Sequence, residues 1–228
     1  GNWSMNSILG RFLYNRYSRI EKKLFYSSDK VIILTKKAFK LRQHHQINTK
    51  NIQIIPCVTN FSKFKILSSY ERKFLRKKYS IDDNTILLTY FGSLDKIYNL
   101  KYMLKFFAFC SKRNAKIKLL IISKDYMNYL DYVKSNISLN LKNKIKFKSS
   151  SSSELYKFIG ISDYSLCFIS PSKARNASSP TKIGESLSCG VPIIYKSGVG
   201  DLDDHLSKIH YIISTLACGE STKFLELK

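Results

Sequence analysis

The sequence predicts an α/β protein built around a doubly wound parallel sheet. From residue 69 onward, short apolar runs alternate with segments of helical period. Two of the runs, 86–91 and 117–122, are apolar at almost every position, as is typical of strands buried on both faces. The stretches between the runs suit crossover helices of about 10–15 residues. Strands and helices in strict alternation favour this fold over separate all-α and all-β regions.

Each element follows from its own pattern. We expect strands at 86–91, 117–122, 144–147, 164–169 and 191–195. Helices are expected at 69–79, 99–113, 126–139, 153–160 and 180–189. Residues 201–206 look helical and 211–213 look like a short strand, whereas 216–228 show no assignable pattern.

The first 60 residues show a similar alternation on a smaller scale. Residues 8–26 carry apolar side chains at steps of three and four, which predicts an amphipathic helix with a basic face. That face holds Arg11, Arg16, Arg19, Lys22 and Lys23. It is either an ordinary surface or a face that meets anionic lipid. A buried strand at 29–35, a helix at 36–45, a strand at 52–56 and a linker at 57–69 complete this part.

Composition narrows the class of protein. A chain of 228 residues with 44% hydrophobic residues can bury a substantial core, and no apolar run approaches the ~20 residues of a membrane span. No signal peptide is visible. Five cysteines stand singly, a spacing that argues against zinc and disulfides and fits a reducing, cytoplasmic environment.

The net charge of +23 is large, from 39 Lys and Arg against 16 Asp and Glu. Attraction to an anionic membrane surface and a lysine-rich compositional habit are both compatible with it. Nucleic-acid binding is the least favoured explanation, because no motif combines basic and aromatic residues for recognition.

The stretch Ser179–Ile194 organises the rest of the chain. Pro180 suits the first turn of a helix, Ser178 or Ser179 can serve as its N-cap, and Gly190 stands where a left-handed C-cap is expected. Free N–H groups at a helix N-terminus attract anions. Lys182 and Glu185 lie one turn apart, so both can face one crevice and hold a sugar nucleotide. The competing interpretation is an ordinary capped helix without a ligand.

Small and polar residues follow five strands in succession. Ligands of doubly wound sheets bind beyond the carboxyl ends of the strands, so these residues would border a ligand crevice. They are Gly92-Ser93, Ser123-Lys124, Lys148-Ser149, Ser170-Pro171-Ser172 and Lys196-Ser197-Gly198.

The order of these signals resembles retaining glycosyltransferases of the GT-B fold, the group called glycosyl transferases group 1. The resemblance covers most of residues 20–205, and the Pro-Thr-Lys-Ile-Gly-Glu segment with Cys189-Gly190-Val191-Pro192 is its most specific part. It implies two Rossmann-like domains with the active site between them. Residues 1–60 would then be the last part of an acceptor-side domain, and residues 61–228 the nucleotide-sugar donor domain, shortened at its end. We therefore expect a fragment or a truncated copy.

The resemblance also implies roles for individual residues. Glu185 matches the glutamate that contacts the donor ribose. The other donor-binding residues implied are Pro180, Thr181 and Lys182 at the diphosphate, Gly92 and Ser93 in the loop that closes near it, and Lys148 and Ser149 beside the base. The family often has an arginine where Ser93 stands, for which Lys96 is the nearby substitute, and an acidic residue where Ala177 stands. No catalytic residue is assigned.

The function implied is transfer of a sugar, with retention, from a nucleotide-diphosphate sugar to a glycan or lipid-linked acceptor. The alternative is a nucleotide-binding module that transfers nothing. Neither a metal nor a cofactor is expected, since backbone dipoles and lysine offset the diphosphate charge. The partners implied are the nucleotide sugar, its acceptor and an anionic membrane surface, with no nucleic acid. The expected location is the cytoplasm, peripheral at the inner membrane face.

Overall fold

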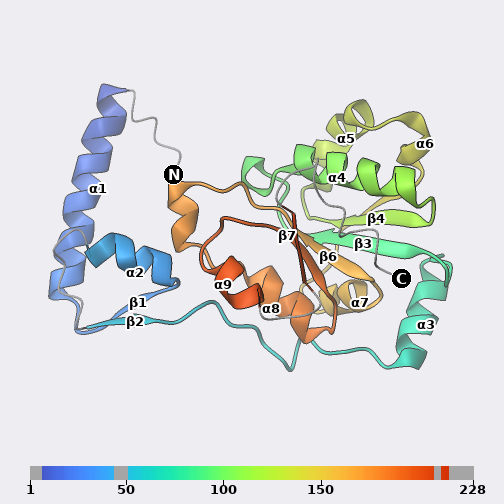
Figure 1. Cartoon of the computed structure of the whole chain (residues 1–228), viewed down its shortest axis with the longest axis horizontal. Coiled ribbons are helices and arrows are strands. Elements are labelled where there is room, and N and C mark those ends of the chain that lie inside the picture. The colour runs from blue at the N-terminus through green and yellow to red at the C-terminus, as the bar shows by residue number, and fades with distance from the viewer. Residues whose placement is uncertain (1–6, 44–50, 208–211, 216–228) are drawn as a thin grey trace.

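The computed structural model of the chain describes residues 7–43, 51–207 and 212–215. A small N-terminal unit stands beside a larger α/β domain (Figure 1). The small unit contains α1 (Ile8–Ser27), β1 (Val31–Ile33), α2 (Lys36–Gln43) and β2 (Ile52–Ile54). The strands of the larger domain are β3 (Ile86–Phe91), β4 (Ile117–Ile122), β5 (Ile145–Lys148), β6 (Tyr164–Cys167), β7 (Ile193–Lys196) and β8 (Ile212–Thr215). Its helices are α3 (Ser69–Lys78), α4 (Leu100–Arg113), α5 (Leu130–Asn136), α6 (Leu139–Lys142), α7 (Leu155–Gly160), α8 (Thr181–Ser188) and α9 (Leu202–Leu206), with 3₁₀ turns η1 (Lys96–Tyr98), η2 (Tyr126–Tyr129) and η3 (Lys173–Ala177).

The large sheet confirms the predicted doubly wound fold. Its six strands lie in the order β5-β4-β3-β6-β7-β8, and every neighbouring pair is parallel. The chain builds outward from β3 to β5, then returns to place β6 on the other side of β3. This reversal is the switch point at which doubly wound sheets form their ligand crevice.

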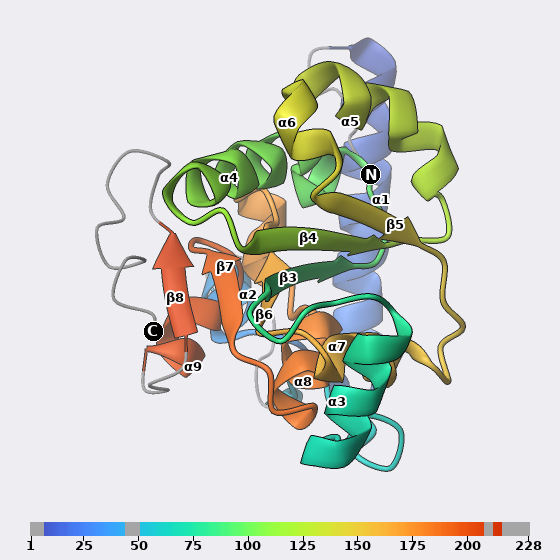
Figure 2. The ribbon, with the colours of Figure 1, turned by 90° about the vertical axis from the view of Figure 1, so that its right-hand side faces the viewer.

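Helices cover both faces of the sheet. In Figure 2, α4, α5 and α6 lie above it, and α3, α7 and α8 lie below. Alternate residues of β3 point to opposite faces, as the pleat requires. Leu88 and Tyr90 therefore join the core under α4, whereas Leu87 and Phe91 join the core against α7.

A network around Asp163 ties α3 to the sheet. Its carboxylate accepts hydrogen bonds from Arg72 at 2.8 Å, from Arg76 at 3.3 Å and from the backbone N–H of Leu87 at 2.7 Å. Arg76 is only 2% exposed and also donates to the carbonyl oxygens of Ile161 and Thr85. Asp163 thus forms ion pairs with two arginines, a pairing that the sequence analysis did not predict.

The small unit is a two-stranded parallel sheet with two helices. The strand predicted at 29–35 is present as β1, but the prediction that it is buried is wrong, because Ile32 is 61% exposed. Among the described residues β1 has a single neighbouring strand, β2, so it is not enclosed as a central strand would be. The predicted helix at 8–26 is confirmed as α1, of whose residues only Gly10 is buried.

A connecting segment, residues 55–67, joins the two units and runs along α8 and α7. Two glycines of the larger domain allow its close approach. A β-carbon at Gly184 would lie 3.0 Å from Thr59 Oγ1, and one at Gly160 would lie 2.7 Å from Leu67 Cγ. Both distances are shorter than ordinary van der Waals contact, so the segment lies against positions that lack a side chain.

A second contact holds the N-terminus of α2 against the larger domain. The Asp201 carboxylate, only 4% exposed, accepts hydrogen bonds from the backbone N–H groups of Lys36 and, at 3.1 Å, Lys37. The Thr35 hydroxyl donates to the backbone oxygen of Asn176. A carboxylate at a helix N-terminus compensates both the free N–H groups and the helix dipole.

Two further predictions need correction. The helix expected at 126–139 begins as the 3₁₀ turn η2, continues as α5 and ends at Asn136, because Ile137 and Ser138 adopt extended conformations before α6 begins. Neither Ser178 nor Ser179 caps α8, since the helix begins at Thr181 and Pro180 is the N-cap. The prediction for 211–213 is met in part by β8, whereas residues 216–228 lie outside the described residues.

No helix within the described ranges is long and apolar enough to cross a membrane. Over the same ranges, His, Cys, Asp and Glu side chains nowhere gather in threes as a metal site would require. The described cysteines, Cys57, Cys110, Cys167 and Cys189, form no disulfide.

Candidate functional site

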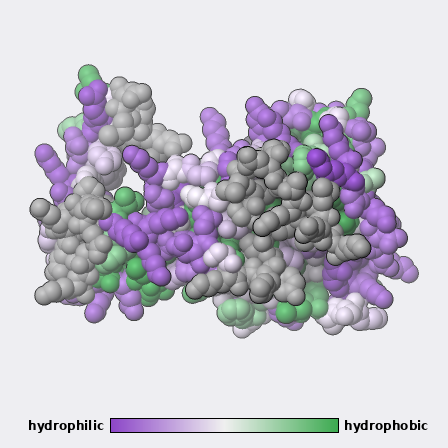
Figure 3. All heavy atoms as spheres, viewed as in Figure 1, coloured by the Kyte–Doolittle hydropathy of each residue, from purple (hydrophilic) through white to green (hydrophobic). Residues whose placement is uncertain are grey.

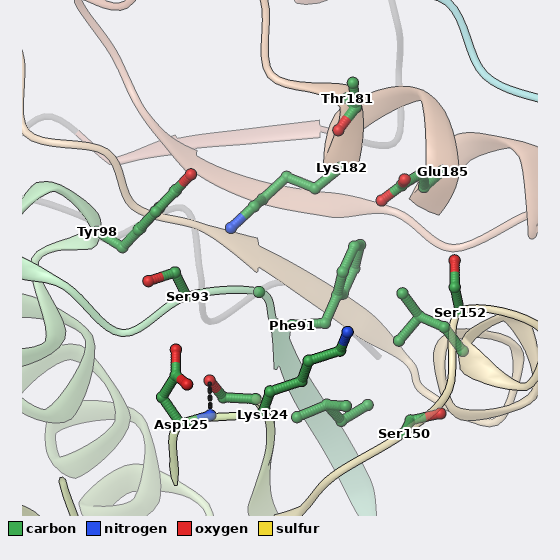
Figure 4. Close-up of a pocket in the computed structure, with 14 residues that line it drawn as sticks. Phe91, Ser93, Tyr98, Lys124, Asp125, Ser150, Ser152, Thr181, Lys182 and Glu185 are labelled. Carbon is green, nitrogen blue, oxygen red and sulfur yellow. Dashed lines mark hydrogen bonds between the residues drawn. The ribbon is translucent and has the colours of Figure 1, made fainter. Parts of the chain in front are cut away.

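A pocket of about 470 Å³ opens at the carboxyl ends of β3 and β4 and is bordered by α8 (Figure 4). This is the position that the switch point between β3 and β6 predicts. The lining residues come from four separate segments of the chain. They are Phe91, Gly92, Ser93 and Tyr98; Ile122, Ser123, Lys124 and Asp125; Ser150, Ser152 and Leu155; and Thr181, Lys182 and Glu185.

The sequence of α8 fixes both ends of this short helix. Pro180 at the N-cap offers no side-chain hydrogen bond, so the N-cap residue leaves the first N–H groups of α8 uncapped. At the other end Gly190 has φ +71°, and Val191 N–H donates to Ser186 O while Gly190 N–H donates to Leu187 O. This pair of bonds is a Schellman motif, which confirms the predicted glycine stop.

Lys182 is the buried cation of the pocket. Its side chain extends from α8 towards Tyr98 (Figure 4), and the residue is only 8% exposed. The ammonium lies 4.1 Å from the ring centre of Tyr98 and 4.4 Å from that of Tyr90, and it donates to the Tyr90 hydroxyl at 3.3 Å. Among the described residues no carboxylate forms an ion pair with it. Burial lowers the pKa of Lys182.

Glu185 lies one turn further along α8 and faces the same pocket (Figure 4). Burial raises the pKa of its carboxyl group, and the positive charges of Lys182 and Lys63 partly oppose that rise. Within the described part of the chain, its carboxylate has no hydrogen-bond or salt-bridge partner. Its acceptor oxygens are therefore available to hydroxyl or N–H groups of a ligand.

The turn after β3 brings backbone close to Lys182. Gly92 has φ +122°, a conformation that strains residues with a β-carbon. A β-carbon there would also lie 3.1 Å from Lys182 Nζ. Glycine at this position thus leaves room for the ammonium group at the mouth of the pocket.

Five of the nine residues predicted to bind a donor line the pocket, and the other four do not. Gly92, Ser93, Thr181, Lys182 and Glu185 line the pocket. Lys96 lines a different pocket beside α5, and Lys148 lines a third one, where its ammonium lies 4.5 Å from the ring centre of Tyr79. Pro180 and Ser149 are the sequence neighbours of the lining residues Thr181 and Ser150, but they do not themselves line the pocket.

Sequence reasoning missed several lining residues. Ser150 and Ser152 take the place expected for Ser149, since the loop after β5 turns inward one residue later. The sequence places Lys124 at the end of a strand but does not single it out as a site residue. Tyr98 carries no sequence signal at all, because only the packing of η1 against α8 brings it to Lys182.

Residues 71–206, well over half of the chain, match the family described as Glycosyl transferases group 1. The chain belongs to the glycosyl transferases group 1 family. The lining residues Gly92 to Glu185 all lie within the matched region. No curated protein matches the sequence of this family member.

Solved structures extend the comparison to the fold. Anabaena Alr3699/HepE in complex with UDP and glucose matches with a TM-score of 0.68 at 13% identity, over 88% of this chain and 53% of that one. WaaG, a glycosyltransferase involved in lipopolysaccharide biosynthesis, matches with a TM-score of 0.70 at 16% identity, over 92% and 56%. A glycosyltransferase from Rickettsia africae ESF-5 matches with a TM-score of 0.65 at 18% identity, over 85% and 52%.

This likeness establishes the fold of the group 1 chain as the Rossmann-like α/β fold of GT-B glycosyltransferases. The chain spans about half the length of the structures it matches.

Proposed function

We propose that residues 61–228 bind the nucleotide-diphosphate sugar donor of a retaining glycosyltransferase, and that residues 1–60 belong to its acceptor-side domain. One observation carries the proposal: Lys182, Glu185 and the uncapped N-terminus of α8 all border one pocket at the switch point of the sheet. Membership of the group 1 family and the UDP and glucose in the Anabaena structure support it.

The chemistry of the pocket suits a diphosphate next to a ribose. Free N–H groups at the start of α8 and the Lys182 ammonium would offset the charge that develops on the leaving diphosphate. The Glu185 carboxylate would accept hydrogen bonds from the ribose hydroxyls. Lys124 lies across the pocket from Lys182 and adds a second positive charge (Figure 4).

Donor binding is tested by calorimetry with uridine, guanosine and adenosine diphosphates. We expect one of them to bind, and Lys182→Met and Glu185→Gln each to weaken it at least about tenfold, or 1.4 kcal/mol. Lys134→Met and Asp131→Asn are the matched controls, because these exposed side chains lie on α5 outside the pocket. Unchanged affinity in the Lys182 and Glu185 variants would refute the assigned site.

Transfer to a glycan or lipid-linked acceptor is the activity that we propose for the whole enzyme. The alternative, a nucleotide-binding module without transfer, is favoured by Ser93 and Ala177, which replace an arginine and an acidic residue often found in the family. A turnover assay with a panel of nucleotide sugars separates the two. Release of the nucleoside diphosphate together with formation of a glycosylated acceptor would support the transferase. Binding of the nucleotide sugar without turnover would support the nucleotide-binding module.

We further propose that α1 meets an anionic membrane surface. Ile8 is 87% exposed and Phe12 60%, while Arg16, Arg19 and Lys22 are exposed on the same helix. Among the coloured residues of Figure 3, hydrophilic side chains predominate on the face shown. Apolar and basic side chains together favour the boundary between lipid and water.

The membrane proposal predicts binding to vesicles that contain phosphatidylglycerol and not to vesicles of phosphatidylcholine alone. The double variant Arg16→Glu/Arg19→Glu should lower the affinity at least about 25-fold, since each basic residue contributes about 1 kcal/mol. Lys105→Glu/Lys112→Glu on α4 changes the net charge equally and serves as control. Equal losses in both double variants would show that net charge alone attracts the protein.

A further inference from the structure

The surroundings of Lys182 are unusual for a lysine so deeply buried. Buried cations are normally paired with a carboxylate, because an unpaired charge loses its hydration without compensation. Lys182 instead faces aromatic rings and one hydroxyl group. Its ammonium lies 4.1 Å from the ring centre of Tyr98, 4.4 Å from that of Tyr90 and 5.9 Å from that of Phe91, so the two tyrosine rings are the nearest. It also donates to Tyr90 Oη at 3.3 Å. The two rings stand edge to face, with centres 6.3 Å apart.

The two rings differ in how they are held. Tyr90 is fully buried in β3, and its hydroxyl donates to the carbonyl oxygen of Ser93. Tyr98 stands at the end of η1, which Asp95 caps by accepting from Ile97 N–H at 3.0 Å. The carbonyl oxygen of Ile97 in turn accepts from Ser170 N–H at 2.9 Å, which anchors η1 to the end of β6.

We propose that Tyr98 is a positioning residue for donor binding: its ring holds the Lys182 ammonium, charged and without a carboxylate partner, at the mouth of the pocket. The inference rests on the proposed function and extends it to a residue that does not itself need to touch the donor. A carboxylate in the place of the ring would neutralise the ammonium and compete with the diphosphate. An aromatic face stabilises the charge without accepting a conventional hydrogen bond, so the N–H groups that do not donate to Tyr90 Oη can donate to an anion.

The ionisable groups around Lys182 come from every element packed against it. They are Glu185 on its own helix, Cys167 on β6, Asp95 and Tyr98 at η1, Tyr90 on β3, and Lys124 across the pocket. Burial raises the pKa of the Cys167 thiol to about 11, so this group is neutral at pH 7. The carboxylates of Glu185 and Asp95 act on Lys182 through space without forming an ion pair with it.

The first test uses the free protein and needs no ligand. The ¹³Cε resonance of Lys182, assigned by its absence in Lys182→Met, is titrated in the wild type, Tyr98→Phe and Tyr98→Leu. Removing the ring should destabilise the charged form, so the titration midpoint should fall by about 0.5–1 pH unit in Tyr98→Leu. Tyr98→Phe keeps the aromatic face and should titrate like the wild type. A midpoint unchanged in Tyr98→Leu, or lowered equally in both variants, would overturn the inference.

The second test measures binding of the diphosphate that the wild type prefers, and of the corresponding nucleoside. Tyr98→Leu should lower the affinity for the nucleoside diphosphate about three- to tenfold and leave the affinity for the nucleoside unchanged. Only the diphosphate group would interact with the Lys182 ammonium. The diphosphate affinity of Tyr98→Leu should also decline with rising pH from a lower pH than in the wild type, while Tyr98→Phe restores both properties. Equal losses for diphosphate and nucleoside would indicate a structural role only.

The outcomes also separate this inference from the proposed function. If the wild type binds none of the nucleotides, the proposed function fails, and the titration still decides whether Tyr98 holds the charge. If the wild type binds and Tyr98→Leu behaves like it, only the inference fails. Thermal unfolding of each variant is measured first, and Tyr98→Met replaces Tyr98→Leu if the latter does not fold.

Discussion

At the scale of single residues, the pocket contains charges in an environment that disfavours them. Burial lowers the pKa of Lys182 and raises that of Glu185, so the folded state resists ionisation of both groups. Neither group is needed to bury apolar surface. We infer that the folded chain is less stable because of them, and that their contribution is to ligand binding.

Substitution of Lys182 should therefore stabilise the folded protein while it weakens donor binding. A lysine whose pKa is lowered by folding destabilises the folded state below that lowered value, and the effect disappears above the ordinary value of 10.5. Lys182→Met should raise the unfolding temperature by a few degrees at pH 7. The gain should shrink as the pH rises towards 10.5, which thermal unfolding across a pH series can measure.

The matched substitution Lys134→Met should leave the unfolding temperature unchanged, since its side chain is 63% exposed. A lower unfolding temperature for Lys182→Met at pH 7 would contradict this account. It would mean that the aromatic faces and the Tyr90 hydroxyl more than compensate the lost hydration.

At the scale of elements, α3 depends on charge pairing as much as on apolar contact. Its N-terminus has a reciprocal capping box, in which Ser68 Oγ accepts from Glu71 N–H at 3.1 Å and Glu71 Oε2 accepts from Ser68 N–H at 2.8 Å. Its inner side presents Arg72 and Arg76 to Asp163. One carboxylate thus binds both α3 and the backbone N–H of Leu87 near the start of β3.

Asp163→Asn should destabilise the protein by about 2–3 kcal/mol. The substitution leaves the buried Arg76 without its charge partner, and the estimate lies below the usual range for buried pairs because Asp163 itself is 29% exposed. Denaturant unfolding provides the measurement. Asp82→Asn, which removes the surface pair with Lys118, should change the stability by less than about 0.5 kcal/mol. Similar effects of the two substitutions would show that the Asp163 network contributes little.

The sequence predicted the strands more reliably than their surroundings. The bounds of β3 and β4 agree with prediction because their apolar runs are long and end at polar residues. The exposure of β1 depends on how many strands lie beside it, and a local sequence pattern does not predict that number. Lys182 and Glu185 could be paired in advance because one short helix carries both. Tyr98 could not, since its contact with Lys182 depends on how η1 packs.

At the scale of the whole molecule, buried polar contacts connect the two units. Asp201 caps α2 from the neighbouring domain, and Thr35, only 1% exposed, donates to the backbone of η3. The capped helix belongs to one unit and the capping residue to the other. The start of α2 is therefore stabilised by the domain that contains the pocket.

Asp201→Ala should loosen α2 selectively. Loss of a capping carboxylate costs about 1–2 kcal/mol, and here the loss falls on a single helix. Hydrogen exchange should quicken at Lys36, Lys37 and the following amides of α2, while α4 keeps its protection. Asp204→Ala, the exposed neighbour on α9, is the control. Unchanged hydrogen exchange in α2 would show that the start of this helix does not depend on the Asp201 carboxylate.

The connecting segment that lies against Gly160 and Gly184 has a mechanical consequence. Its Thr59 contacts Gly184 on α8, the helix that bears Lys182 and Glu185, and its Leu67 contacts Gly160 at the end of α7. The small unit is therefore joined through this segment to the helix that borders the pocket. We expect a displacement of the small unit to be transmitted to α8 and to alter donor binding.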